Sequence, residues 1–125
     1  MSKKILLGIL GSPRKAGNSE LFVKELHRNL PAEWELRLMR LPELDVRPCR
    51  ACYKCLFGEM RCPIKDDFQL AMDALAAADA LAIAAPAYLL GANASLKNFL
   101  DRGLGLYGRI DELWGKPAVG VAIAG

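Results

Sequence analysis

The 125-residue sequence has few aromatic residues, a single histidine and no strong excess of charge. Because aromatic residues make up only 7% of the chain, alanine, leucine, valine and isoleucine must fill most of the interior. The formal net charge is +3, the sequence pI is about 8.7, and the basic residues are spread along the chain. Nucleic-acid-binding domains usually carry a clustered basic stripe and a higher pI, so we expect no nucleic-acid partner. The small positive excess fits a bound anion or an ordinary solvated surface.

A long apolar segment is also missing from the start of the chain. The apolar run at 5–12 is only about eight residues long, which is too short to cross a membrane, and no small-residue cleavage site follows it. We therefore expect a cytoplasmic protein with no membrane partner. Cysteines are usually reduced in that compartment, so the four cysteines favour metal or redox chemistry over structural disulfides.

The pattern of apolar residues predicts one α/β domain over residues 1–125. Strands are predicted at 5–11, 34–41, 80–85 and 117–125, and helices at 21–30, after Asp66 and at 94–101. Asn18 or Ser19 is the expected cap of the first helix, and Asp66 with Gln69 resembles a capping box. Strands that alternate with helices imply a doubly wound parallel sheet between two helical layers.

Segment 11–19, between the first predicted strand and the first helix, has the groups that bind a phosphate. A helix N-terminus supplies unpaired N–H groups and the positive end of a dipole. The side chains and backbone that contribute are Ser12, Arg14, Gly17, Asn18 and Ser19, with Lys15 as a second basic candidate. The segment is not a P-loop, because five residues separate its two glycines and no lysine follows the second. The dinucleotide fingerprint G-x-G-x-x-G is absent as well, and the alternative is a polar turn that binds no ligand.

A second candidate segment, 86–95, follows the apolar strand predicted at 80–85. Parallel strands bring it to the same edge of the sheet as segment 11–19. A flat ring system needs an apolar wall and backbone groups around its polar rim. The residues that supply them are Pro86, Ala87, Tyr88, Leu89 and Gly91. Taken alone, such a loop is also typical of ordinary packing.

Together these segments resemble the NADPH-dependent FMN reductase family of flavodoxin-like proteins. The resemblance rests on I-L-G-S-P-R-K-A-G-N-S at 9–19, on A-A-P-A-Y-L-L-G-A-N-A-S-L-K-N-F-L-D-R at 84–102 and on the spacing between them. It implies a flavodoxin-like fold that binds FMN. The phosphate would contact the five residues named first in segment 11–19, and the flavin ring would lie against the five named in segment 86–95.

Residues 42–65 form a predicted long loop that contains all four cysteines, Cys49, Cys52, Cys55 and Cys62. A loop of this length inside a small domain usually has a function. The spacing C-x2-C-x2-C-x6-C is typical of thiolate ligands of a [4Fe–4S] cluster. Zinc is one alternative, although structural zinc sites usually pair two separate C-x2-C arms. Free or disulfide-forming thiols are the other alternative.

The same cysteine run resembles the iron–sulfur flavoprotein branch of the family, whose members carry it in the loop after the second strand. We expect such a cluster to relay electrons between a carrier such as ferredoxin and FMN, which then reduces a small acceptor. The alternatives are an NAD(P)H-dependent FMN or quinone reductase without a cluster, and a non-catalytic flavin- or metal-binding electron carrier. No side chain is a clear general acid or base, so we predict no catalytic residue. Asp101 and Arg102 are expected to pair locally at a helix end.

The C-terminal end departs from the family pattern. Flavodoxin-like domains normally have five strands, whereas this sequence ends in the fourth predicted strand, without the fifth strand and the last helix. We therefore expect a fragmentary chain or a partner that completes the sheet. The resemblance further implies a homodimer or tetramer with the cysteine loop near a subunit interface.

Overall fold

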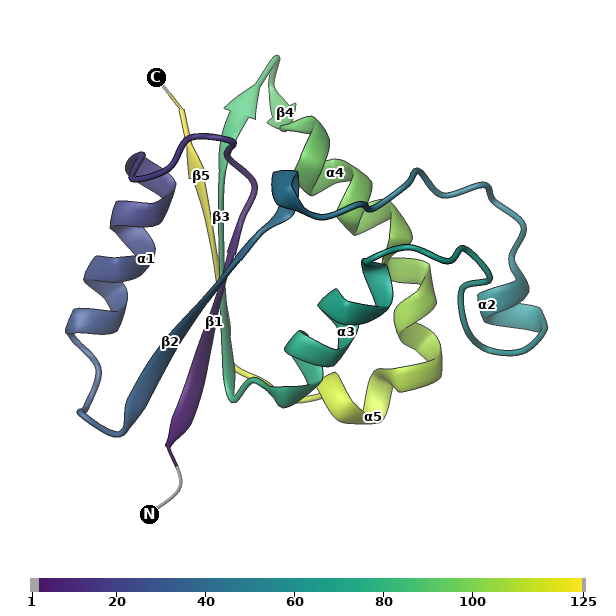
Figure 1. Cartoon of the computed structure of the whole chain (residues 1–125), viewed down its shortest axis with the longest axis horizontal. Helices are drawn as coiled ribbons and strands as arrows, with labels where there is room; N and C mark the ends of the chain where they lie inside the picture. Colours follow the sequence, from purple (N-terminus) through teal and green to yellow (C-terminus); the bar gives the residue numbers. More distant parts are fainter. Residues whose placement is uncertain (1–2, 125) are drawn as a thin grey trace.

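The computed structural model describes residues 3–124 of the chain. Four parallel strands, labelled in Figure 1, form most of the sheet. Their pairing gives the order β2–β1–β3–β5. They are β1 (Lys4–Leu10), β2 (Trp34–Arg40), β3 (Ala80–Tyr88) and β5 (Ala118–Ile123). A fifth strand, β4 (Gly91–Ala92), pairs antiparallel with the end of β3. The predicted parallel sheet is confirmed, but the predicted count of four strands misses β4, because two exposed residues give no periodic signal.

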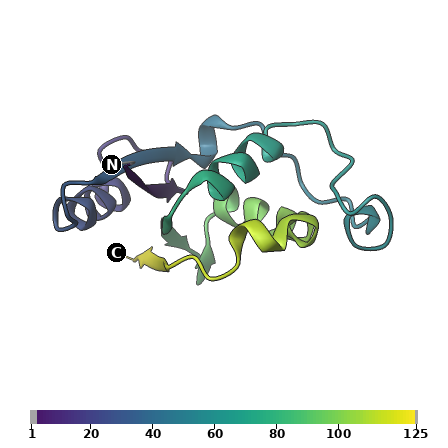
Figure 2. The ribbon, with the colours of Figure 1, turned by 90° about the horizontal axis from the view of Figure 1, so that it is seen from below.

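Helices cover both faces of the sheet, as Figure 1 and Figure 2 show. Helix α1 (Asn18–Arg28) lies on one face, and α3 (Phe68–Ala77) and α4 (Ala94–Asp101) lie on the other. Alternate side chains of β1 serve the two layers. Leu6 and Leu10 pack in the cluster that contains Val23 of α1, whereas Leu7 and Ile9 pack with phenylalanines of α3 and α4. Because both faces of β1 are covered, this strand is buried along most of its length.

Short helical segments complete the chain. Segment η1 (Leu41–Glu43) follows β2, α2 (Lys54–Phe57) lies within the long loop, and η2 (Arg102–Arg109) and α5 (Ile110–Leu113) connect α4 to β5. The loop predicted at 42–65 is present apart from η1 and α2, and it extends away from the sheet, beyond α3 and α4 (Figure 1, Figure 2). Among residues 3–124, no helix has both the length and the apolar character needed to cross a membrane.

Two element boundaries differ from the sequence prediction. Strand β3 does not end before Pro86 but continues to Tyr88, because Pro86 pairs in parallel register with Ile123 and the next residues pair with β4. At α3 the cap position is Asp67, and no side chain caps the helix in the predicted way. Asp66 still accepts the Phe68 amide at 3.0 Å, but its carboxylate also holds a buried arginine, described below.

Candidate functional site

Segment 11–19 leaves the end of β1 and faces the end of β3 across a cavity of about 270 Å³. The cavity is lined by Ser12, Arg14, Gly17, Asn18, Ser19, Pro86, Ala87, Tyr88 and Ile123. Eight of the ten residues predicted to contact a cofactor therefore lie around one space. Ile123 of β5 is not among the predicted residues, because an apolar residue in a predicted strand carries no signal of a site.

Helix α1 presents its N-terminus to this cavity. The helix begins at Asn18, and Gly17 holds the cap position without any side-chain cap, so the predicted capping by Asn18 or Ser19 is wrong. Both side chains instead belong to the first turn and line the cavity. The first N–H groups of a helix have no acceptor within the helix, and the dipole there favours a negative charge. The cavity therefore has the features of an anion site.

Close contacts between three elements fix the start of segment 11–19. The Gly11 amide donates to the Ala84 carbonyl at 3.0 Å, and Asn93 Nδ2 donates to the Gly11 carbonyl at 2.6 Å. A Cβ atom on Gly11 would lie 2.7 Å from Asn93 Oδ1 and 2.8 Å from the Ala85 Cβ. Only glycine fits there without a shift of its neighbours, and β1, β3 and the start of α4 are held together at this point.

Charges near the cavity are partly compensated. Glu20 of α1 is buried, and its carboxylate pairs with Lys24 at 2.8 Å and with the guanidinium of Arg40. Hydrogen bonds from Lys24 and Arg40 outweigh the effect of burial and lower the pKa of Glu20 to about 2. Lys15 pairs with Glu43 at 3.8 Å, whereas none of the ion pairs among residues 3–124 includes Arg14. The charge of Arg14 is therefore available to an anion in the cavity.

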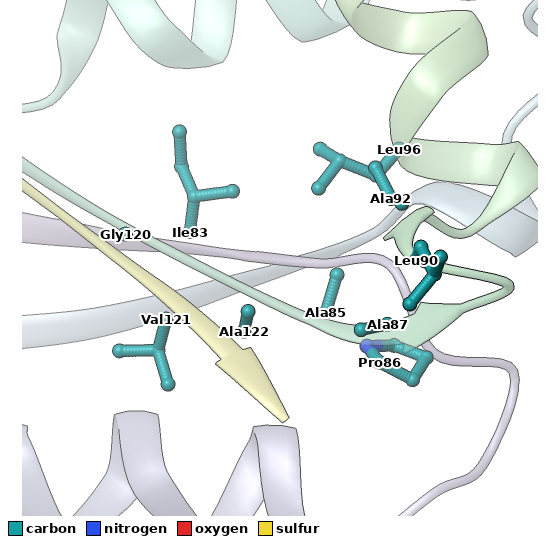
Figure 3. A pocket seen from close by; sticks show the side chains of 11 residues that line it. Ile83, Ala85, Pro86, Ala87, Leu90, Ala92, Leu96, Gly120, Val121 and Ala122 are labelled. Carbon is teal, nitrogen blue, oxygen red and sulfur yellow. The ribbon is translucent and has the colours of Figure 1, made fainter. Parts of the chain in front are cut away.

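The other two predicted residues, Leu89 and Gly91, lie outside this cavity. Leu89 is fully exposed at the tip of the β3–β4 hairpin, where it and Leu90 have φ values of 45° and 66°. Gly91 lines a second cavity, of about 520 Å³. Figure 3 shows this second cavity. Pro86 and Ala87 line both cavities.

The second cavity is lined only by residues without polar side chains. Figure 3 shows Ile83, Leu90 and Leu96 around it, contributed by β3, the hairpin and α4. Its complete lining is Ile83, Ala85, Pro86, Ala87, Leu90, Gly91, Ala92, Leu96, Gly120, Val121 and Ala122. The end of β3 thus separates a polar cavity next to the N-terminus of α1 from an apolar one next to α4.

The four predicted metal ligands lie in the cysteine loop, defined here as residues 47–66. Cys49 and Cys52 are exposed, Cys62 is half-buried, Cys55 is buried, and none of them forms a disulfide. Burial raises the pKa of the Cys55 thiol, and the other three thiols raise it further. The Ala51 amide donates to Cys49 Sγ at 3.4 Å, a contact of the kind that tunes sulfur ligands.

The cysteine loop fits a metal centre in its chemistry rather than in its geometry. Four thiol groups come from one loop, and the other three cysteines contribute to the raised pKa of Cys55. Within the described part of the chain, however, no three ligating side chains are close enough together to hold a metal ion. The [4Fe–4S] cluster therefore stays a prediction. The four thiols are suitable ligands, but their sulfur atoms do not lie close enough together to form a cluster site.

The predicted pairing of Arg102 with Asp101 is wrong. Asp101 instead contacts Lys97. The Arg102 side chain is buried against Asp66, with Nη1 2.7 Å from Oδ2. No local pattern indicates this pair, because its members are 36 residues apart in the sequence.

A family model described as NADPH-dependent FMN reductase matches residues 5–125, almost the whole chain. The chain belongs to this family. Among curated proteins, an iron-sulfur flavoprotein of Methanocaldococcus jannaschii is 35% identical over 98 residues, which cover 78% of this chain and 50% of that protein. An iron-sulfur flavoprotein of Methanosarcina thermophila is 31% identical over 121 residues, 96% of this chain and 63% of that protein. The chain thus spans about half to two-thirds of the length of these relatives.

Solved structures show the same fold at lower identity. The flavoenzyme NAD(P)H:(acceptor) oxidoreductase FerB of Paracoccus denitrificans aligns with a TM-score of 0.66 and 21% identity, over 95% of this chain and 60% of that one. RosB, with a bound 8-demethyl-8-formylriboflavin-5'-phosphate, aligns with a TM-score of 0.66 and 15% identity, over 97% of this chain and 52% of that one. The flavodoxin-like architecture predicted from the sequence is confirmed.

Proposed function

We propose that this protein is an FMN-dependent oxidoreductase of the iron–sulfur flavoprotein type, which moves electrons between a carrier and a small acceptor. The observation that carries the proposal is the polar cavity in which segment 11–19 meets the end of β3. Membership of the FMN reductase family and the names of the curated relatives support it.

The polar cavity suits the phosphate of FMN. The N-terminus of α1 offers unpaired N–H groups, and Ser12, Asn18 and Ser19 add hydroxyl and amide groups around the same space. Arg14 contributes a positive charge that no acidic side chain nearby neutralises. The flavin ring would then lie against Pro86 and Ala87, where the polar and apolar cavities meet.

The cysteine loop suits a second redox group. Cys49, Cys52, Cys55 and Cys62 would hold a [4Fe–4S] cluster. When bound, FMN supplies hydride and single-electron chemistry and the cluster supplies single-electron chemistry. The chain's own residues bind and orient these groups, and ferredoxin or NAD(P)H is the proposed donor.

The two sites lie towards opposite ends of one chain (Figure 1, Figure 2). We therefore include a homodimer or tetramer in the proposal, in which the cysteine loop of one chain approaches the polar cavity of another. A cytoplasmic location belongs to it as well, because unpaired thiols persist best in a reducing compartment.

The proposal is tested on anaerobically purified protein, assayed for FMN, iron, sulfide and zinc and examined by absorption spectroscopy. We expect flavin bands superposed on broad absorption near about 400 nm from cysteinyl iron–sulfur centres. Flavin bands with rapid NADPH oxidation and no iron would instead identify a reductase without a cluster. Flavin without turnover with any donor would identify a carrier, and the absence of any FMN affinity would contradict the proposal as a whole.

The phosphate contact is tested by two neighbouring variants, Arg14→Ala and Lys15→Ala. Arg14 lines the cavity, whereas Lys15 pairs with Glu43 outside it. A hydrogen bond to a charged group contributes about 1.5–3 kcal/mol, so Arg14→Ala should weaken FMN binding roughly 10-fold or more. Riboflavin has no phosphate, so its affinity should be the same in both variants. An equal loss of FMN affinity in Lys15→Ala would show that the phosphate lies elsewhere.

A further inference from the structure

Arg102 is an almost completely buried cation at the base of the cysteine loop, directly after α4. The Arg102 side chain is 1% exposed and that of Asp66 is 0% exposed. Two bonds join them, from Nη1 to Oδ2 at 2.7 Å and from Nη2 to Oδ1 at 3.1 Å. The guanidinium also lies 4.5 Å from the ring centre of Phe68. Desolvation of two charges is costly, so the position of this pair beside the cysteines indicates a role beyond packing.

The pair closes the neck of the cysteine loop, defined here as the place where residues 45–47 meet residues 66–67. Arg102 Nη1 donates to the Arg47 carbonyl at 2.8 Å, and Asp66 Oδ2 accepts the Arg47 amide at 2.8 Å. One step further out, the Asp45 amide donates to Asp67 Oδ2 at 2.8 Å and the Asp67 amide donates to the Asp45 carbonyl at 2.9 Å. All four cysteines lie between the two joined positions, so Arg102 and Asp66 fix both ends of the segment that carries them.

One nitrogen of the Arg102 guanidinium makes no hydrogen bond within residues 3–124. Nη1 and Nη2 are bonded, whereas Nε is buried and makes no hydrogen bond within the described residues. Cys62 lies on the same side of η2: a Cβ on Gly105 would be 3.6 Å from the Cys62 Cβ and 3.3 Å from Cε1 of Phe68, the ring against which the Arg102 guanidinium packs. Buried polar groups in folded proteins almost always find partners, so this unpaired N–H suits an acceptor such as a thiolate.

We propose that Arg102 is a positioning residue for the metal centre, which clamps the neck of the cysteine loop and donates its Nε–H to the sulfur of Cys62 when that sulfur is a thiolate ligand. The inference rests on the proposed function, because it requires the four cysteines to bind a metal or cluster. Outer partners of this kind orient the ligands, and hydrogen bonds to cluster sulfurs change the reduction potential. Arg102 thereby sets the potential of the centre without touching iron.

The decisive variant is Arg102→Lys, reconstituted anaerobically with iron and sulfide beside the wild type. Lysine keeps a positive charge for Asp66 but lacks the planar fork and its Nε–H donor. The matched control is Arg109→Lys in the same η2 segment, because Arg109 bonds Asp73 and Glu112 instead. We expect Arg102→Lys to titrate at a more negative midpoint potential by EPR, with Arg109→Lys like the wild type. An unchanged potential in folded, fully loaded Arg102→Lys overturns the proposal.

A second measurement on the wild type covers the case in which Arg102→Lys fails to fold. In protein with ¹⁵N-labelled arginine, Cd(II) serves as a diamagnetic probe of thiolate ligands. We expect Cd(II) to shift the Nε–H resonance of Arg102 and to slow its exchange with solvent, while that of Arg109 stays unchanged. If Arg102→Lys folds, it should bind Cd(II) about 10-fold more weakly.

The outcomes separate the inference from the proposed function. Cd(II)–thiolate absorption without any change at Arg102 Nε–H overturns the inference and leaves the proposed cluster site standing. Wild-type protein that takes up neither Cd(II) nor iron contradicts the cluster site itself, and the inference fails with it.

Discussion

The polar cavity and the cysteine loop are built in different ways. At the cavity, segment 11–19 follows the central strand, and the Gly11 amide still bonds to β3. The cysteine loop has no strand beside it, and side chains of Arg102, Asp66 and Asp67 hold its neck. The backbone of the sheet therefore positions one site, whereas a few hydrogen bonds of polar side chains position the other.

Backbone conformation shows the same difference. Three non-glycine residues with positive φ lie in the cysteine loop, namely Ala51 at 53°, Tyr53 at 57° and Met60 at 60°. Segment 11–19 has one, Ala16 at 55°. Such conformations cost about 1–3 kcal/mol each and persist where surrounding contacts impose them, often at ligand sites. The conformation of the cysteine loop thus depends more heavily on contacts at its neck and at its tip, residues 54–60, than that of segment 11–19 depends on its own contacts.

The largest expected effect comes from breaking the neck with Asp66→Asn. This variant leaves a buried guanidinium without its counter-charge, and loss of one partner of a buried pair costs about 3–5 kcal/mol. Urea unfolding measures the change in the free energy of unfolding. Asp101→Asn is the matched control, because its partner Lys97 is exposed and one helical turn away, and we expect a loss of about 0.5 kcal/mol or less. Similar losses in both variants would contradict the distinction between neck and surface.

The contrast between the sites also explains what the sequence reveals. Residues 12–19 and 86–88 could be placed together in advance, because the first group follows β1, the second lies at the end of β3, and parallel strands end at one edge of a sheet. The neck could not be predicted, since Asp66 and Arg102 lie at the ends of separate elements, 36 residues apart, with ordinary helix-end patterns around them. Sequence periodicity detects regular elements, and it carries no information about long-range pairs of side chains.

The second prediction tests the polar cavity with the variant Gly11→Ala. The added Cβ would lie 2.7 Å from Asn93 Oδ1 and 2.8 Å from the Ala85 Cβ, so the junction of β1, β3 and α4 must shift. Overpacking of this kind costs about 1–3 kcal/mol, and FMN affinity should fall with it. Gly103→Ala is the control, because Gly103 lines neither cavity and the nearest atom to its added Cβ is a Leu106 side-chain carbon at 3.8 Å, an ordinary contact. Fluorescence titration with FMN and thermal unfolding report the two effects, and equal behaviour of the two variants would mean that the junction is compliant.

The third prediction concerns stability at acid pH. Each site has one nearby carboxylate with a lowered pKa. Burial alone would raise the pKa of Asp66, but hydrogen bonds from Arg102 and two backbone amides lower it to about 2. The pKa of Glu20, beside the polar cavity, is also lowered to about 2. Because these values lie below the usual ones, both ionised groups stabilise the fold above about pH 4.5, and that stabilisation is lost as the pH falls towards 2.

Glu20→Gln separates the two contributions. The melting temperature of the wild type should fall between about pH 4.5 and pH 2. The variant should show a shallower fall over the same range, because one of these two carboxylates no longer takes up a proton. Thermal unfolding followed by circular dichroism across this range gives both curves. Curves of equal steepness would remove Glu20 from the account and leave the neck as the main acid-sensitive element.

The smallest effect is expected where the tip of the cysteine loop rests on η2. The Met60 carbonyl lies directly over Gly108, so an added Cβ at this position must push the tip away. Because the neck stays closed in Gly108→Ala, the free energy of unfolding should change by only about 1 kcal/mol. Gly103→Ala adds the same atom to the same segment, where its nearest neighbour is a Leu106 side-chain carbon at 3.8 Å, an ordinary contact. Amide hydrogen exchange should quicken at residues 54–60 in Gly108→Ala but not in Gly103→Ala, since the tip has no strand that would hold it once this contact is lost.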